Sequence, residues 1–180
     1  MKVFLFLAEG FEEIEAIAPI DIFRRAGMEV CTVSITEKNE VRGAHGITIL
    51  TDCLFSKTDF SDNDLLFLPG GMPGTNNLDE FENLKITLTN QVDRGKPLAS
   101  ICAAPSILGK MGLLEGKEAI CYPGFEKFLN GAIISNEIIV KADNIYTAKA
   151  AGVAIPFALR LVEELMGKEV AEKLAESICY

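Results

Sequence analysis

Short runs of hydrophobic residues recur along the chain, and most of them lack the strict alternation of a half-exposed strand. Such runs are typical of parallel strands that are covered on both faces. They predict strands at residues 2–7, 29–35, 65–68, 97–101, 119–121 and 145–147. Residues 41–50 also have extended character, but Gly43 and Gly46 interrupt it, so we expect a turn there.

Between these runs, hydrophobic residues recur every three or four positions, which predicts amphipathic helices. Pro19 lies inside the first helix, so we expect a kink or a break there. Strands that alternate with helices predict an α/β fold, a doubly wound and mostly parallel sheet sandwiched by helices, in one domain of residues 1–180. We expect helices at residues 12–26, 79–93, 105–111, 153–166 and 168–178, a short helix within 122–129, and a hairpin-like excursion at 133–140.

Composition narrows the classes of function. The net charge of −9 argues against nucleic acid as a partner, because nucleic-acid binding needs basic patches. The apolar start of the chain is too short for a signal peptide or a membrane span, so we expect a cytoplasmic protein without membrane contact. Five widely spaced cysteines without a CxxC pair predict no disulfide framework and no zinc site. With His45 as the single histidine, we expect no metal site.

The most informative stretch is residues 96–106, KPLASICAAPS, where a buried strand turns sharply into a helix at Cys102. Ser100 and Ala103 keep the turn free of bulk, and Pro105 suits the first turn of the helix. This pattern is typical of a nucleophile elbow, in which a strained strand-to-helix turn presents a reactive side chain. We expect the helix N-terminus to lower the pKa of the Cys102 thiol and favour the thiolate. The alternative is a structural cysteine buried in the core.

A glycine pair, Gly70 and Gly71, follows another buried strand. In doubly wound folds the site lies beyond the carboxyl ends of the strands, so this loop should lie beside the Cys102 turn. Its backbone N–H groups, with that of Ala103, would form an oxyanion hole. The alternative is a turn that simply requires positive φ.

An acidic cluster, Glu12, Glu13 and Glu15, opens the first predicted helix. We interpret Glu12 and Glu13 as ordinary complements of the helix dipole. Glu15 lies between apolar residues, so we expect burial to raise its pKa and keep it protonated. It could then donate a hydrogen bond to a thiolate and work as an acid or base. The alternative is a first-turn acid without a catalytic role.

Taken together, these segments resemble one known family. The similarity is to the ThiJ/PfpI superfamily, and more narrowly to its branch that contains the parkinsonism-associated deglycase. It extends nearly from end to end and implies a flavodoxin-like sandwich that forms a homodimer. The segments that carry it are AEGFEEIEAI, DIFRRAG, LFLPGG, ASICAAP and FALRLVEELMGKEVA.

The resemblance also implies roles for residues. It makes Cys102 the reactive thiol and Glu15 the carboxyl that hydrogen-bonds it, with Gly71 and Ala103 supplying backbone N–H groups to the pocket. It implies activity without a cofactor on small aldehydes such as methylglyoxal and glyoxal, or on glycated amines. Sensor, chaperone and protease roles are discussed for other members.

The chain departs from the family pattern near the pocket. Ala103 stands where the protease-type branch has histidine, and a cysteine peptidase without its base is disfavoured. Tyr122 stands where the deglycase branch usually has histidine; tyrosine is a poor base at neutral pH, so proton transfer would rest on Glu15. His45 and Arg25 match arginines near the partner subunit's site in relatives, and an exposed turn histidine is the alternative for His45.

We therefore predict a cofactor-independent glyoxalase or deglycase that acts through a Cys102 thiolate on 2-oxoaldehydes or their early glycation adducts. The alternative is an oxidative-stress sensor or chaperone without turnover, in which Cys102 is oxidised and Glu15 hydrogen-bonds the oxidised form. The motif cannot separate the two, because both require the same reactive thiol. No residue supports a thiamine-pathway role, which only the superfamily's name suggests.

Overall fold

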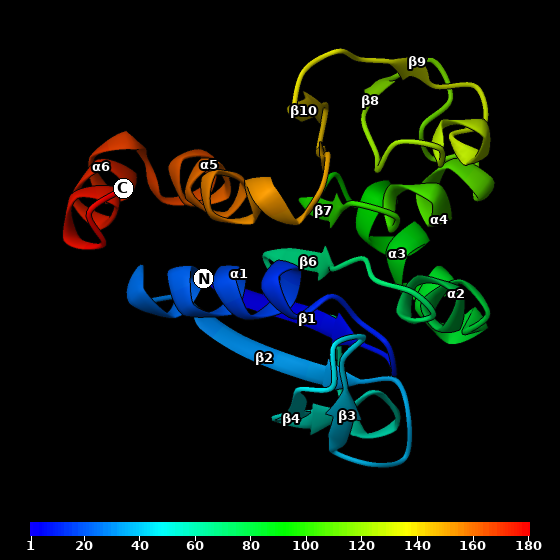
Figure 1. Cartoon of the computed structure of the whole chain (residues 1–180), viewed down its shortest axis with the longest axis horizontal. Coiled ribbons are helices and arrows are strands. Elements are labelled where there is room, and N and C mark those ends of the chain that lie inside the picture. The colour runs from blue at the N-terminus through cyan, green and yellow to red at the C-terminus, as the bar shows by residue number, and fades with distance from the viewer.

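The computed structural model describes all 180 residues, and a seven-stranded sheet runs through its centre (Figure 1). The strand order is β10-β11-β7-β6-β1-β2-β5, and every neighbouring pair is parallel except β10 with β11. This arrangement confirms the predicted doubly wound, mostly parallel sheet. The strands of this sheet are β1 (Lys2–Leu7), β2 (Glu29–Ser34), β5 (Cys53–Leu54), β6 (Leu65–Leu68), β7 (Leu98–Ile101), β10 (Ile139–Ala142) and β11 (Ile145–Ala148).

Helices cover both faces of the sheet. Alternate residues of β1 enter two separate cores: Val3 and Leu5 face one, while Phe4 and Phe6 face the other. None of the helices has the length and apolar content needed to cross a bilayer. The first face is covered by α1 (Glu13–Arg25), α5 (Ala154–Met166) and α6 (Lys168–Ser177), the second by α2 (Gly74–Asp79), α3 (Glu82–Asp93) and α4 (Pro105–Lys110).

The topology brings three loops to one edge of the sheet. From β1 the chain crosses to β2 on one side and later to β6 on the other, so the strand order reverses at β1. Ligand sites in such folds lie beyond the carboxyl ends of the strands at this switch point. The loop after β1 leads into α1, which carries Glu13 and Glu15; the loop after β6 carries Gly70 and Gly71, and the turn after β7 begins at Cys102.

Two smaller sheets flank this edge. The hairpin of β3 (Glu40–Arg42) and β4 (Thr48–Leu50) is antiparallel, with the expected glycine-rich turn between its strands. The strand predicted at 119–121 is instead β8 (Glu118–Ala119), which pairs with β9 (Ile133–Ile134) outside the main sheet. Three short 3-10 turns, Phe55–Lys57, Glu126–Phe128 and Ala151–Val153, complete the elements.

Two predictions about helices differ in part from the structure. The α1 helix continues through the buried Pro19, so it is not broken there, and packing against α5 stabilises it across the proline. The helix predicted at 79–93 is α3, which begins three residues later at Glu82, and the separate short helix α2 before it was not predicted; Phe81 lies between the two. That residue is extended (φ −88°, ψ 93°), and its ring packs edge-on against Phe55 with centroids 4.9 Å apart.

Cysteine spacing predicted no disulfide framework, and the structure contains one disulfide. Cys31 on β2 and Cys53 on β5 are joined by a disulfide, with their Cα atoms 6.8 Å apart. The parallel register pairs Val33 with Cys53, so Cys31 and Cys53 lie diagonally opposite on the same face. Sequence spacing contains no sign of this pair, because it depends on β5 joining the edge of β2.

Candidate active site

Cys102 occupies a strained turn at the end of β7. Its φ of +65° is unfavourable for a residue with a Cβ, by about 1–2 kcal/mol. Backbone hydrogen bonds hold it on both sides: its N–H donates to Ala148 O at 2.9 Å, and its carbonyl accepts from Tyr122 N at 2.7 Å. Small residues and Pro105 follow, as a nucleophile elbow requires.

Two backbone N–H groups, those of Ala103 and Gly71, face the Cys102 sulfur and favour its charged form. Gly71 has φ +92°, and a Cβ there would overlap the backbone of Phe11 and Glu12. Gly70 is also closely surrounded, because a Cβ would lie 2.7 Å from Glu15 Oε2 and 2.8 Å from Cys102 Cβ. The glycine pair therefore lets three loops approach one another closely.

Glu15 is fully buried on α1, with 0% of its surface exposed. Its Oε2 accepts a hydrogen bond from Gly70 N at 2.8 Å, while Oε1 is buried and has no hydrogen-bond partner. Burial raises the pKa of Glu15 to about 7, although the Cys102 thiol and the Gly70 N–H act in the opposite direction. Near neutral pH this carboxyl is therefore poised to take or give a proton.

The pKa of the Cys102 thiol differs from the sequence expectation. Burial and the neighbouring Glu15 carboxylate raise it, and the N–H groups of Ala103 and Gly71 offset only part of that rise. The helix N-terminus was expected to lower this pKa, but α4 has only six residues. Its effect is outweighed by the desolvation of the thiol and by the nearby Glu15 carboxylate. A thiolate at this site thus needs its proton to move to Glu15 rather than to solvent.

The raised pKa of Glu15 predicts how stability depends on pH. The native state holds this proton more tightly than the unfolded state, so its contribution is full below about pH 4.5 and is lost as pH rises towards 7. The change from 4.5 to about 7 corresponds to about 3 kcal/mol. Urea unfolding at pH 4.5 and pH 8 should show this loss in the wild type and not in Glu15→Gln. Exposed Glu176→Gln is the control, and equal pH slopes in wild type and Glu15→Gln would contradict the prediction.

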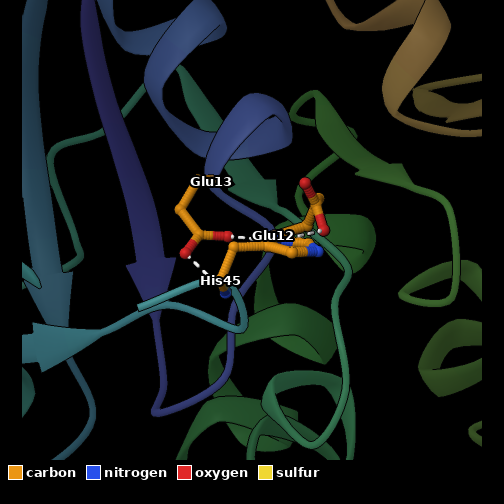
Figure 2. Close-up of side chains that lie close together, drawn as sticks. All are labelled: Glu12, Glu13 and His45. Atoms are coloured by element: carbon orange, nitrogen blue, oxygen red, sulfur yellow. Dashed lines mark hydrogen bonds and ion pairs between the residues drawn. The ribbon is translucent and has the colours of Figure 1, made fainter. Parts of the chain in front are cut away.

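Glu13 is a residue whose role the sequence did not reveal. Its carboxylate is buried and holds the turn of the β3–β4 hairpin: Oε1 accepts from His45 N at 2.7 Å, and Oε2 lies 2.9 Å from His45 Nδ1 (Figure 2). Oε1 also accepts from Ile47 N at 3.3 Å. Burial raises the pKa of Glu13, but these hydrogen bonds outweigh it and the pKa is lowered. The interpretation of Glu13 as a mere dipole complement was wrong, because it binds a segment about thirty residues further along the chain.

His45 is exposed at the tip of this turn, and its ring contacts both Glu12 and Glu13. Its hydrogen bond to Glu13 and the charge of Glu12 raise its pKa. Glu12, Glu13 and His45 are the residues that could hold a metal ion, because their ligand atoms all lie within 4.8 Å of one another (Figure 2). The ion pairs of His45 with Glu12 and with Glu13 are enough to hold these atoms close together.

The two remaining candidates, Tyr122 and Arg25, differ in how they relate to the turn at Cys102. Tyr122 contacts the elbow through its backbone N–H, while its side chain is exposed and meets Phe125 edge-on. Arg25 lies ten residues beyond Glu15 on α1, about 15 Å along the helix, and pairs with Asp21 at 2.6 Å. The structure thus brings Cys102, Glu15 and the glycine pair together and leaves Arg25 outside this group.

Sequence comparison decides the family. The sequence profile described as the DJ-1/PfpI family matches residues 1–164. The chain belongs to the DJ-1/PfpI family. Its fold is correspondingly close to that of Toxoplasma gondii DJ-1 in its oxidized form, with a TM-score of 0.95 and 36% identity over 99% of this chain and 98% of that one. This similarity confirms the predicted flavodoxin-like α/β fold.

Other DJ-1/PfpI relatives differ in length and in the activities that their names state. DJ-1 homolog B of Arabidopsis thaliana is 38% identical over 97% of this chain, which spans only 40% of that plant protein. The glutathione-independent glyoxalase DJR-1.2 of Caenorhabditis elegans is 30% identical over 95% of this chain and 91% of its own length. A protein of Thermococcus kodakarensis named a deglycase is 37% identical over 66% of this chain and 70% of its own length.

Proposed function

We propose that this protein is a glyoxalase or deglycase that uses Cys102 without a cofactor. The observation that carries the proposal is the position of the Cys102 thiol beside the fully buried Glu15, whose pKa burial raises to about 7. A carboxyl with this pKa can both accept and return a proton at neutral pH. The names of the worm and archaeal relatives support the same class of reaction.

The proposed reaction starts with attack on the aldehyde of a 2-oxoaldehyde. The Cys102 sulfur bonds to the aldehyde carbon while the thiol proton passes to Glu15, giving a hemithioacetal. The N–H groups of Gly71 and Ala103, which face the sulfur, would stabilise the developing oxyanion. Because the thiol proton moves to Glu15, the carboxyl is neutral when the sulfur reacts, and two negative charges never lie side by side.

The following steps balance within the substrate. Glu15 first passes the thiol proton to the hemithioacetal oxygen and is again a carboxylate. It then takes the proton from the former aldehyde carbon and returns it to the neighbouring ketone carbon, while the hydroxyl proton of the first carbon moves to the oxygen of the second. The first carbon is thereby oxidised and the second reduced. The product is a thioester of a 2-hydroxy acid on Cys102. Water then cleaves the thioester, releases the acid and restores the thiol, so no external oxidant or reductant is needed.

The same attack would serve an early glycation adduct. There the sulfur replaces the amine on the carbon that bears it: the carbon–sulfur bond forms, the carbon–nitrogen bond breaks, and the amine leaves with the thiol proton that Glu15 has accepted, which gives the same hemithioacetal. A free 2-oxoaldehyde and a glycated amine thus share the thioester stage. We propose small aldehydes or glycated amines as substrates on this chemical ground.

The test is formation of hydroxy acid from methylglyoxal across pH 5–9. Wild-type kcat/KM should rise with pH through about 7 and then level off, as Glu15 ionises to accept the thiol proton. Glu15→Gln should lower turnover by about 10²- to 10⁴-fold and remove this limb of the profile. The absence of turnover in wild type with fully reduced Cys102 would favour the oxidative-stress sensor instead.

We also propose that the working form is a homodimer. The α1 helix exposes Ile14 and Ile17, and Ile155 of the neighbouring α5 is exposed as well. Isoleucines exposed on adjacent helices suit burial against a second copy of the chain. Ile17→Lys should weaken dimerisation at least about tenfold in sedimentation velocity. Ile86→Lys, at an exposed isoleucine on α3, is the control, and a monomeric wild type would refute the proposal.

A further inference from the structure

The disulfide between Cys31 and Cys53 lies far from the proposed nucleophile. Cys53 belongs to β5, the edge strand, which has only two residues, and both sulfur-bearing residues are half-buried rather than sealed in a core. The strands β6, β1 and β2 separate β5 from β7, at whose end Cys102 lies. The pair therefore forms a thiol site of its own that a small molecule can reach from the surface.

This disulfide closes the base of the segment that carries the β3–β4 hairpin. Cys31 and Cys53 are 22 positions apart in sequence, and the hairpin lies between them. The hairpin turn rests on the start of α1: Ala44 N donates to Phe11 O at 2.8 Å, and Glu13 accepts the bonds from the turn described above. We therefore expect the disulfide to restrict the motion of the hairpin turn, which contacts α1 at Glu13, two residues from Glu15.

The fold does not depend on the disulfide to keep this segment in place. Asp52, next to Cys53, accepts hydrogen bonds from Thr32 N at 2.8 Å and Thr32 Oγ1 at 2.7 Å, and it pairs with Arg24 at 2.8 Å. Its own N–H donates to Thr32 Oγ1 at 2.9 Å. These bonds remain when the sulfurs are reduced, so both redox states should be folded. A disulfide that can be reduced without unfolding the protein is suited to reversible redox regulation.

We propose that Cys31 and Cys53 form a second redox site, which small disulfides such as glutathione disulfide oxidise reversibly and whose closure steadies the β3–β4 hairpin against α1. This site is independent of chemistry at Cys102. Its ligand class is a low-molecular-weight thiol or disulfide, because the half-buried edge admits a small reactant. Protein disulfides that form transiently in reducing compartments are typically of this regulatory kind.

The reaction balances as two thiol–disulfide exchanges. One cysteine thiol attacks glutathione disulfide, forms a mixed disulfide and releases one glutathione, which takes up the thiol proton. The second cysteine then attacks the mixed disulfide and releases the second glutathione in the same way. The two cysteines lose two electrons, and the glutathione disulfide gains them.

The test compares the fully reduced and the oxidised wild-type protein. Differential alkylation and mass spectrometry across a series of glutathione ratios should show reversible loss of two free thiols, with a cross-linked peptide joining residues 31 and 53. Hydrogen exchange should then slow about tenfold or more at amides of residues 40–54 in the oxidised form, because the loop is tethered at its base. Exchange in β7 and α4 should not change.

Matched variants separate this site from other thiols. Cys31→Ser and Cys53→Ser should each abolish the cross-link and keep the hairpin at the exchange rate of the reduced protein. Cys179→Ser removes an exposed free thiol and should leave both readouts as in wild type. Failure of the pair to close at any glutathione ratio would overturn the proposal, as would equal hairpin exchange in the two states. Neither readout uses turnover, so the outcome is distinct from that of the proposed glyoxalase activity.

Discussion

Cys102→Ala should lose methylglyoxal turnover by at least about 10³-fold, because the substitution removes the only atom placed to bond to the substrate. Alanine retains the Cβ and can adopt the same backbone, whose positive φ is held by Ala148 and Tyr122. The variant should therefore fold, with an unchanged circular dichroism spectrum. The measurement is the rate of hydroxy-acid formation at pH 8 under reducing conditions.

The matched control for this experiment is Cys179→Ala, which removes an exposed cysteine near the C-terminus. It should retain turnover within about twofold, since exposed substitutions rarely disturb the fold. A folded Cys102→Ala protein that keeps a tenth of the wild-type rate would exclude Cys102 as the nucleophile. Loss of activity in the control would instead indicate a general effect of cysteine removal.

Gly71→Ala should be the most destabilising single substitution in the site. A methyl group there meets the backbone of Phe11 and Glu12 at less than van der Waals distance, and φ +92° is unfavourable for alanine. Backbone cannot move aside as a flexible side chain can, so we expect a loss of more than about 3 kcal/mol in the free energy of unfolding. Urea unfolding followed by circular dichroism measures it.

Gly27→Ala isolates the part of this loss that comes from φ alone. Gly27 has a similar φ of +81°, yet a Cβ there would meet no atom within 4 Å. Its substitution should cost about 1–2 kcal/mol, the ordinary penalty for this backbone region. If Gly71→Ala were no worse than Gly27→Ala, the close approach of the loops after β1 and β6 would not be needed for stability.

The features that local sequence determines were predictable. Apolar runs located five of the seven strands of the main sheet, though not β5 or β10, and small residues before Pro105 located the turn at Cys102. In both cases, the cause lies within a few residues of the effect. The burial of Glu15 was predicted, but the reason differs: Ile14 and Ile17 beside it are exposed, and Glu15 is buried because it faces the loops that carry Gly70 and Cys102.

The features that were missed depend on contacts between distant segments. Glu13 looked like any first-turn acid until the β3–β4 hairpin packed against it. The pKa of Cys102 depends on a carboxylate from another helix and on burial, which outweigh the local helix terminus. The pairing of Cys31 with Cys53 follows from the parallel register of β2 and β5, which no spacing rule encodes.

The contact between Tyr122 and the elbow has a consequence for how this protein can be altered. Residue 122 supports Cys102 through its main chain alone, by the 2.7 Å bond from its N–H to the Cys102 carbonyl, while its side chain is 47% exposed. Any side chain except proline can therefore be placed there without loosening the nucleophile. Residue 122 can therefore be varied while the backbone bond that holds the turn at Cys102 stays in place, and a library of residues at this single position measures what its side chain contributes to substrate preference.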